Sequence, residues 1–123
     1  MKKNQEIKWL EEPEAIDYPA AASFLSLIFD GKRVKGMVNE LKVAPLVQFK
    51  SKDIFRASGL PLLGTSNSHV EKDRDKIRAG HKLSPILLVR NPDLGKVIVA
   101  DGYHRLCAVY TFNEDAIIPC KIV

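Results

Sequence analysis

The chain has 123 residues, of which 46% are hydrophobic and 28% are charged. This length and composition are typical of one domain that buries enough apolar surface to fold without disulfides or a structural metal. The longest apolar stretch, residues 20–29, is interrupted by serines and is too short to cross a bilayer, so we expect no membrane partner. The N-terminus, Met1–Glu6, is polar and lacks an apolar signal core, which predicts a cytoplasmic protein.

The net charge of +4 and the isoelectric point near 9.1 allow electrostatic contact with nucleic acid. However, the basic residues are dispersed along the chain and are not interleaved with aromatic residues. We therefore expect any DNA binding to be weak and indifferent to base sequence.

Neither the cysteines nor the histidines form a pattern typical of a redox or metal site. Cys107 and Cys120 lack the Cys-x-x-Cys spacing, so we expect both to be small core residues, with a redox pair as the alternative. The three histidines, His69, His81 and His104, are scattered, and we predict no metal site.

The N-terminal third predicts two helices. Asp17-Tyr18-Pro19 is typical of a helix start, and Asp30-Gly31 of a stop. A second helix is expected over 32–41. We interpret the apolar stripes of both helices as core, the alternative being a partner surface.

A strand is predicted at 46–49. It leads through 50–53 into Ile54-Phe55-Arg56 and a loop that contains Gly59 and Gly64.

The C-terminal half predicts further helices and strands. Ser68 and Glu71 match a capping box at the start of a helix that ends at Gly80, and the mixed charges of this helix favour a solvated face. After it we expect a hairpin, a helix and a last strand: 86–90, a turn at 91–95, 97–100, helix 102–112 and strand 117–123. The fold class is therefore α+β, a small mixed β-sheet with packed helices.

The segment Asp101–Arg105 is the strongest functional signal. It places a glycine, a histidine and an arginine where a strand turns directly into a helix. Free backbone N–H groups and the helix dipole favour an anion there, and His104 and Arg105 add donors suited to phosphate. The alternative is that Gly102 makes a tight turn and Arg105 faces solvent.

The pattern Gly102-x-His104-Arg105-x-x-Ala108 resembles the phosphate-binding motif of the ParB/sulfiredoxin superfamily. Members carry Gly-Glu-Arg-Arg, Gly-Cys-His-Arg or Asp-Gly-x-His-Arg, and this chain is most similar to the last group. Upstream, 83–89 resembles the Pro-Ile-x-Val strand of the family. The resemblance covers 46–123 and implies a ParB/sulfiredoxin-like core, with 1–45 as a helical N-terminal extension of a single domain, 1–123.

The resemblance implies a nucleotide of the ATP or CTP class as ligand. The expected ligand-binding residues are those of the motif, together with three residues elsewhere: Gly102, Tyr103, His104, Arg105, Lys82, Ser84 and Arg56. Lys82 and Ser84 are included because the hairpin brings them to the same end of the sheet, and Arg56 because relatives often carry arginine after the first strand. Sulfiredoxins need a cysteine where this chain has Tyr103, so we expect no sulfinic acid repair.

Three functions stay open. The first is a nucleotide-binding domain that acts in phosphoryl transfer or as a switch. The second is a small-molecule kinase or nucleotide hydrolase, in which Asp101 is the candidate catalytic residue, as a base or as a ligand of Mg²⁺. For Asp101 we favour a simpler role as the helix N-cap. The third is a DNA-associated accessory protein or nuclease, for which the sequence offers no acidic cluster suited to two metals.

Overall fold

The structure, a computed structural model, describes residues 5–123; Met1–Asn4, part of the polar N-terminus noted above, lie outside it. Its helices are α1 (Asp17–Leu25), α2 (Gly31–Val43), α3 (Ser51–Ser58), α4 (Ser68–Arg78) and α5 (Tyr103–Phe112). Its strands are β1 (Lys8–Trp9), β2 (Val47–Lys50), β3 (Lys82–Leu83), β4 (Ile86–Asn91), β5 (Lys96–Asp101) and β6 (Ile117–Ile122). Among the described residues, no helix is both long and apolar enough to cross a membrane.

A four-stranded mixed sheet forms the centre, in the order β2-β6-β4-β5. β4 and β5 form the predicted antiparallel hairpin, and β6 runs parallel to β4 and antiparallel to β2. The α+β class and the mixed sheet are thus confirmed. A second, two-stranded sheet pairs β1 with β3 in parallel; its strands have two residues each, which is too short for a sequence pattern.

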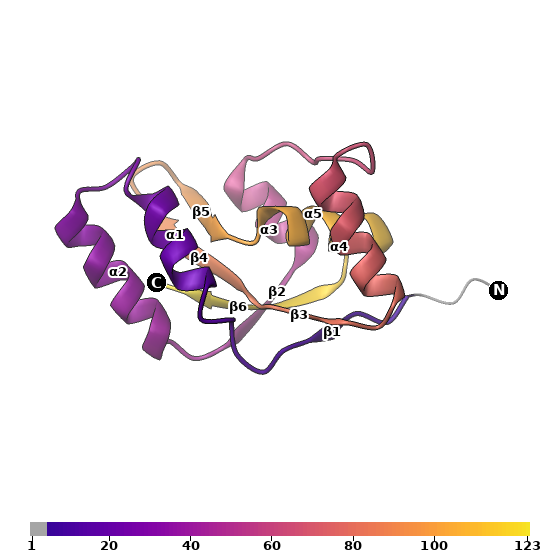
Figure 1. Ribbon diagram of the computed structural model, residues 1–123. Helices are drawn as coiled ribbons and strands as arrows, with labels where there is room; N and C mark the ends of the chain where they lie inside the picture. The colour runs from indigo at the N-terminus through magenta and orange to yellow at the C-terminus, as the bar shows by residue number, and fades with distance from the viewer. Residues whose placement is uncertain (1–4) are drawn as a thin grey trace.

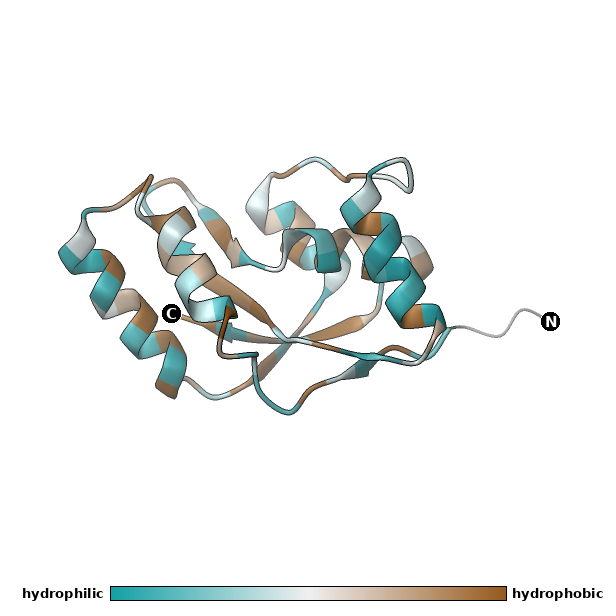
Figure 2. Cartoon of the chain, viewed as in Figure 1, coloured by the Kyte–Doolittle hydropathy of each residue, from teal (hydrophilic) through white to brown (hydrophobic). Residues whose placement is uncertain are grey.

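Alternation along the strands divides the core between the two faces of the sheet. On β4, Ile86 and Leu88 belong to the core under α3, α4 and α5, whereas Leu87 and Val89 belong to the core under α1 and α2. Figure 1 shows α1 and α2 together at the left and α3, α4 and α5 together at the upper right, and Figure 2 shows hydrophobic residues along the central strands.

Ala21 and Leu25 of α1 are therefore core, as predicted, together with the buried residues of α2. Phe24 and Ile28, which belong to the same predicted stripe, are exposed.

Cys107 and Cys120 are also core residues, as expected from their apolar surroundings. Both are fully buried, and neither forms a disulfide. Burial raises the pKa of the Cys120 thiol to about 12 and also raises the pKa of Cys107, so neither forms a reactive thiolate near neutral pH.

Helix α3 is absent from the sequence prediction. The loop that precedes β6 satisfies the first donors of this helix: Ser51 N–H donates to the Ala116 carbonyl and Lys52 N–H to the Glu114 carbonyl, both at 2.9 Å. The Ser51 hydroxyl also donates to Glu114, at 2.6 Å. These partners are more than sixty residues away in the chain, so no local capping pattern predicts the start of this helix.

Helix α4 is capped one residue earlier than the capping box predicts. The Asn67 side chain accepts hydrogen bonds from His69 N–H at 3.0 Å and Val70 N–H at 3.2 Å. Ser68 is the first helical residue, and Glu71 pairs with arginines of its own helix. The prediction of Ser68 as the cap was wrong because the asparagine immediately before it caps the helix, and the Glu71 N–H that a serine cap would accept from donates to the Asn67 carbonyl at 3.0 Å.

Candidate functional site

The turn from β5 into α5 depends on Gly102. Its φ of +104° lies beyond the region that other residues tolerate. A Cβ at this position would lie 2.9 Å from Arg105 Nη2, closer than real Cβ contacts, and 3.0 Å from Ile86 Cγ1, tighter than most of them. Any other residue would strain the backbone and push against a buried neighbour, so the glycine sets the direction of the helix.

Helix α5 begins without a side-chain cap. The first intrahelical bond runs from Leu106 N–H to the Gly102 carbonyl at 2.9 Å. In the described part of the chain, the N–H groups of Tyr103, His104 and Arg105 have no hydrogen-bond acceptor. Three unpaired donors at the positive end of a helix dipole form an anion-binding arrangement.

Asp101 does not cap this helix, so the favoured interpretation as an N-cap was wrong. It is the last residue of β5, and its carboxylate accepts a hydrogen bond from Arg105 Nη2 at 3.0 Å. Burial raises the pKa of Asp101 above its ordinary value, although the guanidinium of Arg105 acts in the opposite direction. Because the carboxylate pairs with the guanidinium of Arg105, it does not accept from the first N–H groups of α5.

Arg105 is held by acceptors of the protein. Its Nη2 lies 3.0 Å from Asp101, 3.5 Å from Asp17 and 3.3 Å from the carbonyl of Pro85. One guanidinium thus faces two carboxylates, and its side chain is only 18% exposed. This geometry offers no excess positive charge to a ligand; it fastens the start of α5 to α1 and to the segment before β4.

Ser84 contacts the same cluster of charged side chains through Asp17. It is buried, its hydroxyl donates to the Asp17 carboxylate, and it accepts from Glu14 N–H at 3.0 Å. The hydroxyl is therefore committed to the junction between α1 and the segment before β4.

A polar pocket of about 230 Å³ opens between the start of α5 and the neighbouring helix α4. Its lining combines residues of the predicted motif with side chains of α4: Asp101, Gly102, Tyr103, His104 and Arg105 from the turn, and His69, Lys72, Asp73 and Lys76 from α4. We call this the polar pocket. The rings of His69 and His104, both in its lining, lie next to each other, with their centroids 4.9 Å apart and their planes inclined by 39°.

The α4 side of the polar pocket was missed by the sequence analysis. Alternating charges indicated a solvated face, and Figure 2 shows α4 as mostly hydrophilic. Lys76 does pair with Asp73 at 3.8 Å, but within residues 5–123 Lys72 has no acidic partner. The signal available in the sequence was spacing: positions 69, 72, 73 and 76 lie on one face of a helix.

Tyr103 connects the site to the loop after α3. Its hydroxyl donates a hydrogen bond to the carbonyl of Pro61. This bond holds the phenol at the wall of the polar pocket. Tyr103 occupies the position where a sulfiredoxin motif has a cysteine.

Two expected ligand residues lie elsewhere. Arg56 projects from α3 into solvent and pairs with Asp53 at 3.6 Å. Lys82 is exposed on β3, opposite Lys8 of β1. Neither is among the residues that line the polar pocket, because α3 and the β1–β3 pair turn these positions outward, and the buried Ser84 does not line it either.

No protein-family model matches this chain, and no significantly similar protein is found among curated proteins or solved structures.

Proposed function

We propose that this chain binds the phosphate group of a nucleotide in the polar pocket. The observation that carries the proposal is the uncapped start of α5, whose three unpaired N–H groups belong to residues that line that pocket. The resemblance of Asp101–Arg105 to a nucleotide-binding motif favours ATP or CTP over free phosphate.

The side chains divide into two roles under this proposal. His104, His69 and Lys72 are donors around the opening, and Lys72 supplies a charge that no protein carboxylate neutralises within residues 5–123. Arg105 is a positioning residue, because its bonds to Asp101 and Asp17 hold the helix start in place. Its effect on a ligand would be exerted through the backbone of the turn.

The charges of the polar pocket favour a magnesium-bound nucleotide over a bare one. The lining includes the carboxylates of Asp73 and Asp101 as well as the lysines. A polyphosphate would be repelled by these carboxylates, and Mg²⁺, which typically binds one or two carboxylates together with phosphate oxygens, reduces that repulsion.

A second candidate function is phosphoryl transfer to a small molecule. It is favoured by Asp101, a carboxylate that lines the pocket and whose pKa is raised by burial. A raised pKa makes a carboxylate a stronger base near neutral pH. Analysis of products after incubation with Mg²⁺ and ATP or CTP distinguishes a transferase or hydrolase from a binding switch.

The proposal is tested by titrating the protein with inorganic phosphate, ATP and CTP, with and without Mg²⁺, by calorimetry and amide NMR. We expect the resonances of Gly102–Arg105 to shift first. Lys72→Gln should weaken nucleotide binding about tenfold or more, because a charge-assisted contact contributes about 1.5–3 kcal/mol.

Lys35→Gln on α2 is the matched control, since it removes the same charge from an exposed position on another helix. Equal losses of affinity in the two variants would mean that binding follows net charge alone. Shifts that avoid Gly102–Arg105 would place the ligand elsewhere and reject the proposal.

A further inference from the structure

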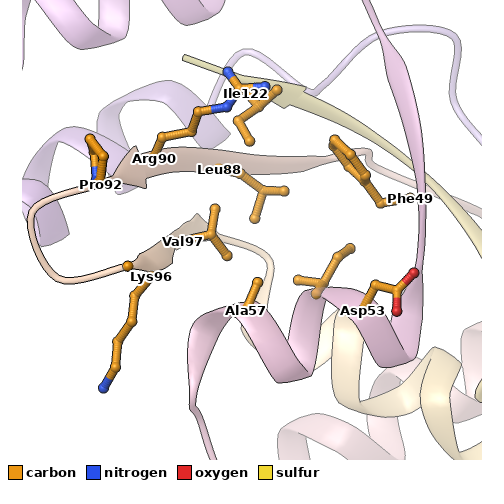
Figure 3. A pocket seen from close by; sticks show the side chains of 11 residues that line it. Phe49, Asp53, Ala57, Leu88, Arg90, Pro92, Lys96, Val97 and Ile122 are labelled. Atoms are coloured by element: carbon orange, nitrogen blue, oxygen red, sulfur yellow. The ribbon is translucent and has the colours of Figure 1, made fainter.

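A second pocket lies at the other end of β5, where α3 ends before the strands that it covers. Helix α3 has eight residues and spans about 12 Å, whereas the six-residue strands β4 and β5 reach about 20 Å. The sheet face beyond the end of the helix is left open as a cavity of about 400 Å³. We call this the apolar pocket; Figure 3 shows the side chains that line it.

The wall of the apolar pocket is hydrophobic and comes from both layers. The sheet contributes Leu88, Val97 and Ile122, and Phe49 closes one side from β2. Phe49, Val97 and Ile122 are only partly buried, although they pack against the core under α3, α4 and α5. Ala57 of α3 lies opposite the sheet, and its short side chain leaves space that a longer one would fill. This part of the core is therefore left without a cover.

The charged groups of the lining lie at the edges of the apolar pocket. The guanidinium of Arg90 lies beside Ile122, and the side chain of Lys96 runs the other way, with its amine next to Gly59 at the end of α3. Asp53, the acidic residue of the lining, pairs with an arginine of its own helix at 3.6 Å. The charges therefore do not converge on the space between the hydrophobic side chains.

This distribution of charge favours a neutral occupant. An ion that enters the apolar pocket gives up its hydration and meets no opposite charge there, which costs free energy. Water is also a poor occupant, because hydrophobic walls offer it few hydrogen bonds. A neutral apolar molecule is stabilised by burial of its own surface and of the partly exposed side chains beneath it. The volume of about 400 Å³ lies in the range of about 300–1,000 Å³ that is typical of small-molecule sites.

We propose that the apolar pocket binds a neutral, mostly apolar small molecule. Its body lies on Leu88, Val97 and Ile122, with Phe49 at one side and Ala57 opposite. Affinity comes from the apolar area that is buried, and selectivity comes from the lack of a partner for a charged group. The site is separate from the polar pocket, because the two linings share no residue.

The test uses three probes that share one aromatic body and differ in charge. Near neutral pH, 1-naphthylmethanol is neutral, 1-naphthoate is an anion and 1-naphthylmethylamine is a cation. Each is titrated into the wild-type protein and followed by amide NMR. We expect the neutral probe to shift the resonances of Leu88, Val97 and Ile122 and to bind at least about tenfold more tightly than either ion.

Variants separate the shape of the apolar pocket from its charges. Ala57→Leu fills the space and should weaken the binding of 1-naphthylmethanol about tenfold or more. Ala20→Leu is the matched control, since it makes the same change at an exposed position of α1, and it should leave binding unchanged. Arg90→Gln and Lys96→Gln should each change the affinity by less than about twofold, because neither cation faces the ligand. Thermal unfolding checks that each variant is folded.

The proposal is rejected if 1-naphthylmethanol leaves the resonances of Leu88, Val97 and Ile122 unchanged, if either ion binds as tightly, or if the two alanine variants weaken binding equally. A loss of affinity in Arg90→Gln or Lys96→Gln as large as that in Ala57→Leu would also reject it, because charge would then hold the ligand. The comparison of probes uses the wild-type protein, so it decides the question even if Ala57→Leu does not fold.

Discussion

The two ends of β5 show how one strand supports two kinds of pocket. At the Asp101 end, the chain turns at once into α5, and the surroundings are backbone donors, histidines and ion pairs. At the Lys96 end, the hairpin extends past α3 and exposes the apolar face of the sheet. The polar pocket arises from unsatisfied groups at a helix start, and the apolar pocket over Leu88 and Val97 arises because α3 is shorter than the strands it covers.

The two arginines at these ends should differ most in their effect on stability. Arg105 is largely buried and faces two carboxylates, whereas Arg90 is exposed. Arg105→Ala leaves Asp101 and Asp17 without their cation, and we expect a loss of about 3–5 kcal/mol in the free energy of unfolding. Arg90→Ala should change it by no more than about 0.5 kcal/mol.

Urea unfolding at neutral pH measures both variants. Similar midpoints would show that the guanidinium of Arg105 does not hold the turn. A variant Asp101→Asn/Asp17→Asn combined with Arg105→Leu should recover part of the loss, because no buried charge is then left without a partner.

The glycines before and after β5 give a second, smaller contrast. Gly95 in the hairpin has φ +63° and open space around it, whereas Gly102 has φ +104° and close neighbours. We expect Gly95→Ala to cost about 1–2 kcal/mol, the ordinary penalty for a left-handed residue, and Gly102→Ala to cost more.

Thermal unfolding ranks these two variants, and nucleotide titration adds an independent readout. Gly102→Ala should also weaken binding in the polar pocket, and Gly95→Ala should not. The reverse order of stability would mean that Arg105 and Ile86 move aside without cost.

The local parts of this fold could be predicted from the sequence because their signals are local. The hairpin turn at 91–95 and the entry into α5 depend on residues next to one another, and both were confirmed. Helix α3 could not be predicted, because its first donors are satisfied by the loop at 113–116.

The candidate site, too, was predicted only where its signals come from residues that are adjacent in the sequence. The motif predicted which residues surround the helix start, but not what holds them. Arg105 was expected to face a ligand, and the sequence could not reveal that Asp17, 88 positions earlier, lies 3.5 Å from its guanidinium. The α4 side chains were also missed, since alternating charge describes a helix surface without saying which neighbour it faces.

The smallest expected effect concerns pH, and it compares Asp101 at the polar end of β5 with Asp115, which pairs with Lys52 of α3 at 2.6 Å. Burial raises the pKa of Asp101 above 3.8, whereas the hydrogen bond from Lys52 lowers the pKa of Asp115 below 3.8. The folded protein therefore binds a proton at Asp101 more tightly than the unfolded chain does. That contribution to stability is complete below pH 3.8 and is lost as the pH rises through the higher folded-state pKa.

Asp115 has the opposite sign: its contribution is present above pH 3.8 and is lost as the pH falls through the lower folded-state pKa. Asparagine cannot titrate, so the stability of wild type relative to Asp101→Asn should fall as the pH rises from about 3 to 7. Relative to Asp115→Asn it should rise over the same interval. Urea unfolding across this range measures both differences, and slopes of the same sign would show that Arg105, and not burial, controls the Asp101 carboxylate.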